Sequence, residues 1–286
     1  MISTTSKDLA PRSVSDVFAA QVNGPTAQVD HNILVLPFSE TQWDPFIVLS
    51  DDRFSTVGFD WHPHRGFQTV TLVLAGELEH RDNAGGFGVL GPGDAQYMAA
   101  GRYAMHYELA HQRRPVHTLQ LWLNLPRELK LMDTNYVDLR AADAALVTGP
   151  GVQARVHAGQ VGDVVGRPAE HFAKRFTLID AELDRDGELA AEVPQADAAL
   201  VYVVDGEVET GGATAATGEA AWFAPGAGGP GPIGIRASRN AHVVVYASEP
   251  IGEPVVLGGP FVMSADEEIE EAFADLHAGA FGPVPE

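Results

Sequence analysis

The sequence predicts an all-β protein made of two β-barrels in one chain, with a short helix near the C-terminus. Short apolar runs of strand length, such as residues 69–74, recur between turn-forming segments such as residues 83–86. Residues 72–79 also resemble residues 201–209, about 130 positions later, which is the pattern of a duplicated β-unit. These two observations indicate two related β-units, each a sandwich or a barrel.

The chain has 286 residues, enough for two ordinary domains, and the repeat suggests where they divide. A looser similarity links residues 91–95 to residues 216–220, so each copy contains a glycine turn followed by a strand. We therefore expect an N-terminal domain at residues 1–135 and a C-terminal domain at residues 136–286.

The C-terminal helix is expected over about residues 265–278. Ser264 followed by Glu267 has the spacing of a capping box, with Ser264 as the N-cap, and Gly279 suits the C-terminal end. Three apolar residues then recur on one helix face, which we expect to dock on the barrels: Ile269, Phe273 and Leu276.

The composition excludes several function classes. Cysteine is absent, so disulfides, cysteine nucleophiles and thiolate metal ligands are excluded. The net charge of −21 opposes binding to a phosphate backbone, so no direct nucleic-acid partner is expected. The sequence has neither a membrane-spanning apolar run nor an apolar signal segment at its start, so we expect a cytoplasmic protein without a membrane partner. We also expect a monomer.

Two short pairs of side chains are the most informative feature: His62 with His64, and His106 with Glu108. In an extended strand, side chains at i and i+2 point to the same face, so each pair can aim both groups at one point. If the two strands face each other inside a barrel, all four groups meet around one metal ion. The other histidines, such as His80, we interpret as structural or solvated.

Imidazole nitrogens with one carboxylate oxygen suit iron, manganese, cobalt, nickel, copper or zinc, and four ligands leave positions open on an octahedral ion. A substrate or dioxygen could therefore reach the metal. Structural zinc sites are closed and usually rich in cysteine, so a purely structural role fits this set poorly. The corresponding positions of the second copy, near residues 193–197 and 231–234, hold no such pair, and we expect no metal there.

The chain resembles the pirin family, whose members are double-barrel proteins of the cupin superfamily, from about residue 25 to residue 280. The motifs that carry the resemblance keep their order and spacing: His-Pro-His-Arg-Gly-Phe at 62–67, Gly-Glu-Leu-Glu-His-Arg-Asp at 76–82, Gly-Pro-Gly-Asp at 91–94, Gln-Leu-Trp-Leu-Asn-Leu-Pro at 120–126 and Gly-Pro-Phe-Val-Met at 259–263.

The resemblance favours barrels over sandwiches and so implies a bicupin fold. It also implies a metal site formed by His62, His64, His106 and Glu108, with Fe(2+) as the expected ion and another divalent first-row metal as the alternative. Certain pirins resemble quercetin 2,3-dioxygenases, which open the ring of a flavonol with dioxygen and release carbon monoxide. On this hypothesis the substrate is phenolic, and Glu108 is the catalytic base because it is the one ligand able to take a proton from a hydroxyl.

A second hypothesis stays open, since other pirins resemble iron-dependent or redox-dependent regulators that bind a transcription factor or a metabolic enzyme. The sequence also departs from the typical family pattern at Gln68, where a glutamate is usual. We interpret Gln68 either as a residue that supports the metal ligands from behind or as a pocket residue, which could orient a ligand or tune bound water. For Arg65 two interpretations remain, a salt bridge to an acid such as Asp82 or a contact with an anionic substrate.

Overall fold

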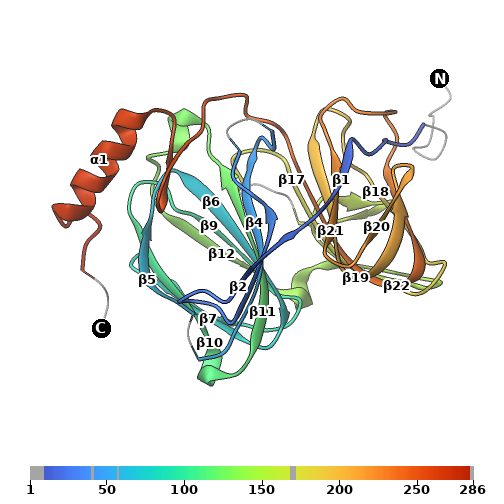
Figure 1. The fold of residues 1–286 in the computed structure, drawn as a ribbon, viewed down its shortest axis with the longest axis horizontal. Coiled ribbons are helices and arrows are strands. Elements are labelled where there is room, and N and C mark those ends of the chain that lie inside the picture. The colour runs from blue at the N-terminus through green and yellow to red at the C-terminus, as the bar shows by residue number, and fades with distance from the viewer. Residues whose placement is uncertain (1–9, 40–41, 57, 168–171, 284–286) are drawn as a thin grey trace. The chain divides into compact units, whose positions relative to one another are not determined.

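The computed structural model describes residues 10–39, 42–56, 58–167 and 172–283. Strands dominate these residues, and the single α-helix among them lies near the C-terminus (Figure 1). The expected all-β class is confirmed. No helix in the described ranges is long and apolar enough to cross a membrane.

The chain forms two compact units. The first barrel consists of residues 21–142 and 251–286, and the second barrel consists of residues up to 20 together with residues 143–250. This grouping differs from a single division after residue 135 because each barrel contains a segment from the far end of the chain. β1 (Asp16–Ala19) pairs with β21 (Glu219–Phe223), whereas Phe261 forms a β-bridge with Arg65.

In the first barrel, a seven-stranded sheet lies in the order β12-β9-β6-β11-β4-β3-β2, and a four-stranded sheet lies in the order β5-β10-β7-β8. The elements are β2 (Gln21–Gly24), β3 (His31–Leu36), β4 (Phe46–Phe54), β5 (Gly58–His64), β6 (Phe67–Ala75), β7 (Leu78–Asp82), β8 (Phe87–Leu90), β9 (Ala95–Ala99), β10 (Ala104–Ala110), β11 (Val116–Asn124), β12 (Asn135–Leu139), β23 (Val256–Gly258), β24 (Phe261–Met263) and α1 (Asp266–His277).

In the second barrel, one sheet runs in the order β1-β21-β19-β22-β17-β14-β13, with the shorter strands β15, β16, β18 and β20 paired beside this path. Besides β1 and β21, the strands are β13 (Ala145–Gly149), β14 (Val152–Ala158), β15 (Gln160–Val161), β16 (Val164–Val165), β17 (Phe176–Leu183), β18 (Glu188–Ala191), β19 (Ala198–Thr210), β20 (Ala213–Ala216) and β22 (Ile233–Ser248).

The internal repeat appears as equivalent backbone contacts. Gly93 donates its N–H to the carbonyl of Val73 at 2.8 Å, and Gly218 donates to the carbonyl of Val203 at 2.8 Å. Three residues beyond each of these acceptors, the chain turns at Gly76 or Gly206 with φ of 76° and 92°, a region that strongly favours glycine. The two barrels are therefore two copies of one β-unit.

The C-terminal helix packs on the first barrel as its apolar face predicted, because Ile269, Phe273 and Leu276 lie against a buried cluster that includes Phe261 and Phe281. The expected capping box is wrong by one residue. Ala265 is the N-cap and makes no side-chain hydrogen bond, so the helix begins at Asp266.

The glutamate that reaches back at the start of the helix is therefore Glu268, whose Oε2 accepts from the backbone N–H of Ser264 at 2.9 Å. At the other end, Gly279 follows the C-cap with φ of 77°, as expected.

Candidate metal centre

Three histidines meet inside the first barrel because strand β10 lies between β5 and β7. The antiparallel register sets His106 of β10 opposite His62 of β5 on one side and opposite Asp82 of β7 on the other. The nitrogen atoms of His62, His64 and His106 lie within 4.8 Å of one another. The ring centroids are 4.3 to 4.9 Å apart, and three imidazoles converging in this way are suited to a shared ion.

Hydrogen bonds at Nδ1 orient two of these rings. His62 Nδ1 lies 2.7 Å from the carbonyl oxygen of Asp60, and His64 Nδ1 lies 3.2 Å from that of Pro260. A carbonyl oxygen only accepts, so in the neutral ring the proton sits on Nδ1 and the lone pair sits on Nε2. Each of the two rings therefore has its Nε2 lone pair available for a metal.

His106 provides the strongest indication that an ion belongs here. Its Nε2 atom is buried and has no hydrogen-bond partner among the described residues. Leaving a buried polar atom without a partner costs about 1–3 kcal/mol, so such atoms call for an explanation. A metal ion that accepts the lone pair of His106 Nε2 would explain the unpaired atom, and the nitrogen donors fit a divalent first-row ion.

The three rings are held neutral, which is the form that binds metals. Burial lowers the pKa of His62, and burial with the neighbouring histidines lowers the pKa values of His64 and His106 well below the ordinary range. His64 and His106 are almost fully buried, whereas His62 is half-buried at the edge of the cluster. The cluster is therefore most accessible on the side of His62.

Glu108 lies on the same strand face as His106 but is not in the group of converging ligand atoms. Its carboxyl group is buried and held by two side chains: Gln120 Nε2 donates to Oε2 at 2.8 Å, and Thr71 Oγ1 lies 3.0 Å from Oε1 and 2.5 Å from Gln120 Oε1. Burial raises its pKa, and the hydrogen bonds with Thr71 and Gln120 oppose the rise. The role of Glu108 as a fourth ligand remains a prediction.

Two residues that the sequence did not single out for function lie behind His106. His80 and Asp82 are on β7, are buried, and face the interior beside β10. His80 Nδ1 lies 3.5 Å from His106 Nδ1, and His80 Nε2 lies 3.5 Å from Asp82 Oδ2. The i, i+2 spacing of His80 and Asp82 is the signal that could have identified them, since it is the same spacing as in the ligand pairs.

The interpretation of Gln68 as a pocket residue is wrong. Gln68 and Thr71 are three positions apart on β6, so they lie on opposite faces of the strand. Thr71 points to Glu108, whereas Gln68 donates to the carbonyl oxygen of Asn124 at 3.0 Å and accepts from the hydroxyl of Tyr97 at 2.9 Å. Gln68 therefore supports the outer side of the strand.

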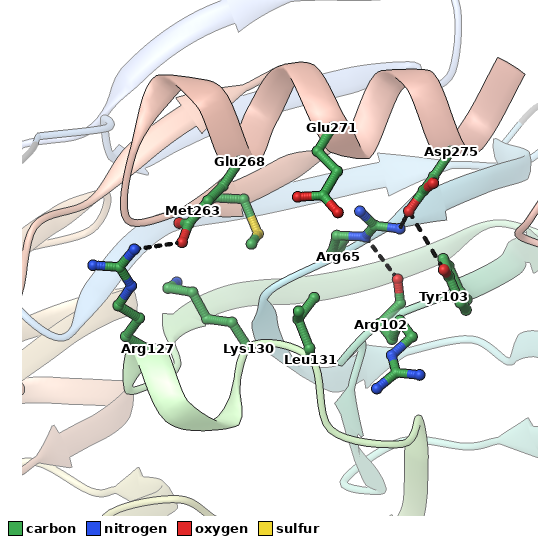
Figure 2. Close-up of a pocket in the computed structure, with 10 residues that line it drawn as sticks. All are labelled: Arg65, Arg102, Tyr103, Arg127, Lys130, Leu131, Met263, Glu268, Glu271 and Asp275. Carbon is green, nitrogen blue, oxygen red and sulfur yellow. Dashed lines mark hydrogen bonds and ion pairs between the residues drawn. The ribbon is translucent and has the colours of Figure 1, made fainter.

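Arg65 forms a salt bridge, but with Asp275 of α1 and not with Asp82. Figure 2 shows its guanidinium between the carboxylate of Asp275 and the backbone of Arg102, at 2.8 Å from each. It also stacks over the rings of Tyr103 and Phe281, at 4.9 and 5.1 Å from their centroids. Arg65 also lines a cavity of about 460 Å³, although its own side chain is almost fully buried. Its salt bridge to Asp275 holds the C-terminal helix against the end of strand β5.

Comparisons with known proteins agree with this architecture. The family model described as Pirin matches residues 19–123, and the one described as Pirin C-terminal cupin domain matches residues 178–282. Over 256 residues the chain is 35% identical to a Pseudomonas aeruginosa protein named "Putative quercetin 2,3-dioxygenase", covering 84% of this chain and 88% of that one.

Over 246 residues the chain is 32% identical to pirin of Homo sapiens, covering 82% of this chain and 81% of that one. Among solved structures, quercetin 2,3-dioxygenase from Acinetobacter baumannii superposes with a TM-score of 0.85 at 26% identity, covering 96% of this chain and 100% of that one.

Proposed function

The chain belongs to the pirin family, and from that premise we propose that its first barrel is a metal-dependent oxygenase site that cleaves the ring of a flavonol, as quercetin 2,3-dioxygenases do. The observation that carries the proposal is the convergence of three imidazoles on one point, with His106 Nε2 buried and without a partner among the described residues. A site that only filled space would hold apolar side chains there.

His62, His64 and His106 are the proposed ligands, with Glu108 as the fourth, and Fe(2+) is the proposed ion. The donor set by itself would suit other first-row ions, because affinity follows the order that favours copper and zinc. When bound, the metal supplies Lewis acidity and a template that brings an electron-rich phenol close to dioxygen.

Glu108 is proposed as the base that accepts the proton of the flavonol hydroxyl. Gln120 donates a hydrogen bond to Oε2, and Thr71 Oγ1 lies within hydrogen-bond distance of Oε1, so the carboxyl group is held in one orientation and keeps lone pairs for an incoming proton. A base must lie within hydrogen-bond reach of the proton that it removes, and this fixed orientation is what would provide that reach.

The substrate is proposed to approach on the side of His62, the one half-buried member of the set. Phe59 is also half-buried, and its ring centroid lies 6.2 Å from that of His62. An aromatic side chain at this distance offers apolar contact to a planar phenolic molecule.

The test is the metal content of protein purified without added metal, followed by oxygen uptake with quercetin on the same sample. A His62→Ala/His106→Ala double variant removes two ligands, and His242→Ala in the second barrel is the matched control. Stoichiometric iron and quercetin-dependent oxygen uptake, both lost in the double variant and kept in the control, are the expected results.

Two outcomes would overturn parts of the proposal. Bound metal without oxygen uptake would remove the oxygenase function and favour a regulatory protein that binds a protein partner. Equal metal content in the wild type and the double variant would show that the ion is bound elsewhere.

A further inference from the structure

We propose that Asp82 and His80 are positioning residues that fix the proton of His106 on Nδ1 and thereby keep its Nε2 lone pair available for the metal. This inference rests on the proposed metal site and adds to it two side chains that are not themselves ligands. It follows from the order of strands β5, β10 and β7 and from the hydrogen-bonding capacity of each atom in the chain of contacts.

The geometry forms a continuous buried chain. Asp82 Oδ2 lies 3.5 Å from His80 Nε2, and His80 Nδ1 lies 3.5 Å from His106 Nδ1. The remaining nitrogen, His106 Nε2, is the buried atom without a partner among the described residues. Asp82, His80 and His106 are each at most 1% exposed, so water does not compete for these contacts.

The proton positions follow from what each group can do. An ionised carboxylate accepts only, so Asp82 selects the form of His80 that carries its proton on Nε2. His80 Nδ1 is then an acceptor, and the neighbouring Nδ1 of His106 must be the donor. A neutral imidazole with its proton on Nδ1 has its lone pair on Nε2, which is the atom that faces the other two histidines.

Asp82 and His80 are both held in place. Asp82 Oδ1 accepts from the backbone N–H groups of Ala84 and Gly86, at 2.8 Å each, which leaves Oδ2 facing His80. The His80 ring stacks on Tyr136 with a centroid distance of 4.8 Å and an interplanar angle of 30°. Such supporting groups around metal-binding histidines fix ring orientation and raise ligand basicity.

The tautomer of His106 depends on Asp82 and His80 more than the tautomers of His62 and His64 depend on their hydrogen-bond partners. His62 and His64 are oriented by backbone carbonyls, which accept under all conditions and cannot be replaced by mutation. The Nδ1 partner of His106 is another imidazole, which can donate or accept. Its tautomer is therefore decided by Asp82, so exchanging that carboxylate for an amide can invert it.

The test is the variant Asp82→Asn, with zinc as a diamagnetic probe. The asparagine carbonyl can keep the two backbone contacts, so its amide NH₂ faces His80 Nε2 and turns this atom into an acceptor. His80 then carries its proton on Nδ1, which meets His106 Nδ1 donor to donor. His106 is forced to carry its proton on Nε2, where it blocks the metal.

Two measurements read this out on full-length protein. Side-chain nitrogen NMR of labelled histidines reports the tautomer directly, and we expect His106 to change from the Nδ1–H form to the Nε2–H form. Competition with a chromophoric chelator reports zinc affinity, which we expect to fall by about 10- to 100-fold, as is usual when such a supporting group is lost. The matched control is Asp180→Asn, the same exchange beside His242 in the second barrel, and it should leave both readouts unchanged.

A second variant covers the case in which Asp82→Asn does not fold. His80→Phe keeps a ring against Tyr136 but removes the acceptor, and it should give weaker zinc binding with His106 in a mixture of tautomers. Unchanged tautomer and zinc affinity in a folded variant would overturn the inference while leaving the metal site intact. Failure of the wild type to bind zinc through His106 would instead overturn the proposed site itself.

Discussion

The two barrels share one strand plan but fill it with opposite chemistry. Val208 of β19 pairs with Ala237 as Leu78 of β7 pairs with Ala110, and each lies two residues after its turn glycine. Reading along the strands from these pairs, Ile233 occupies the position of His106, Ile235 that of Glu108, and Ala191 that of His62.

These positions belong to a large aliphatic cluster in the second barrel, whereas in the first barrel they are polar and buried. The difference teaches that the barrel needs no polar interior in order to fold. Burying polar groups is unfavourable unless they find partners, so a polar interior reports a function.

The surroundings of a histidine also shift its pKa in opposite directions at His106 in the first barrel and at His242 in the second. In the first barrel, burial and neighbouring imidazoles lower the pKa of His106. In the second, burial alone would lower the pKa of His242, but its hydrogen bond to Asp180 at 2.6 Å raises it. The first environment favours the neutral ring, which is the form able to bind a metal, and the second favours the charged ring paired with a carboxylate.

The largest expected effect comes from truncating Ile233 and His106, the side chains at equivalent positions of the two barrels. Ile233→Ala should lower the free energy of unfolding by about 2–5 kcal/mol, because it leaves a cavity in a packed aliphatic core. His106→Ala should remove the bound metal but cost the metal-free protein less, since it also removes a buried atom without a hydrogen bond. Chemical denaturation with metal analysis checks both, and an equal loss of stability would contradict the comparison.

Glu108→Gln separates chemistry from metal retention at the position where the second barrel has Ile235. The amide has nearly the same shape but cannot act as a base, so oxygen uptake with quercetin should fall by about 10²- to 10⁴-fold while most of the metal is kept. Reaction rates and metal content measured on the same preparation show whether Glu108 serves in the chemistry or only in holding the metal. If the variant retains both, Glu108 is not the base.

Gln68→Leu tests the two faces of β6. It removes the contacts with Asn124 and Tyr97, so the free energy of unfolding should fall by about 1–3 kcal/mol. Zinc affinity should stay unchanged, because the site faces the other side of the strand. A large loss of zinc affinity in folded protein would return Gln68 to the site, and Thr71→Val, on the inner face, is the matched comparison.

The smallest expected effect is the pH dependence of stability that comes from the ion pair between His242 and Asp180 in the second barrel. The raised pKa of His242 means that its ion pair stabilises the fold fully below pH about 6.5 and less as pH rises through the folded pKa. Burial would raise the pKa of Asp180, but the hydrogen bond from His242 lowers it, so that contribution is present above pH about 3.9 and is lost in acid.

The variant His242→Gln should therefore lower the free energy of unfolding by about 1 kcal/mol near pH 5.5 and by less at pH 9. Denaturation of the variant and the wild type at both pH values measures the difference. A gap that widens toward pH 9 would contradict the assigned ion pair.

Local patterns were enough to predict the barrels, the helix and the histidine pairs. Alternation along a strand places His62 with His64, and His106 with Glu108, whatever the strands pair with. The same rule already implied that Gln68 and Thr71 face opposite ways, because they are three residues apart. The helix start was missed by one residue, within the usual uncertainty of helix ends.

The residue types and their spacing along the chain thus specified the all-β class and the two pairs of candidate ligands, because strand periodicity and turn chemistry are local properties. Only the tertiary structure showed that β10 lies between β5 and β7, which gives His106 a second neighbour in His80 and, behind it, Asp82. It also pairs Arg65 with Asp275, 210 positions away. Contacts of this kind depend on which strands become neighbours and on where the C-terminal helix packs, and both are decided by packing between segments far apart in the sequence.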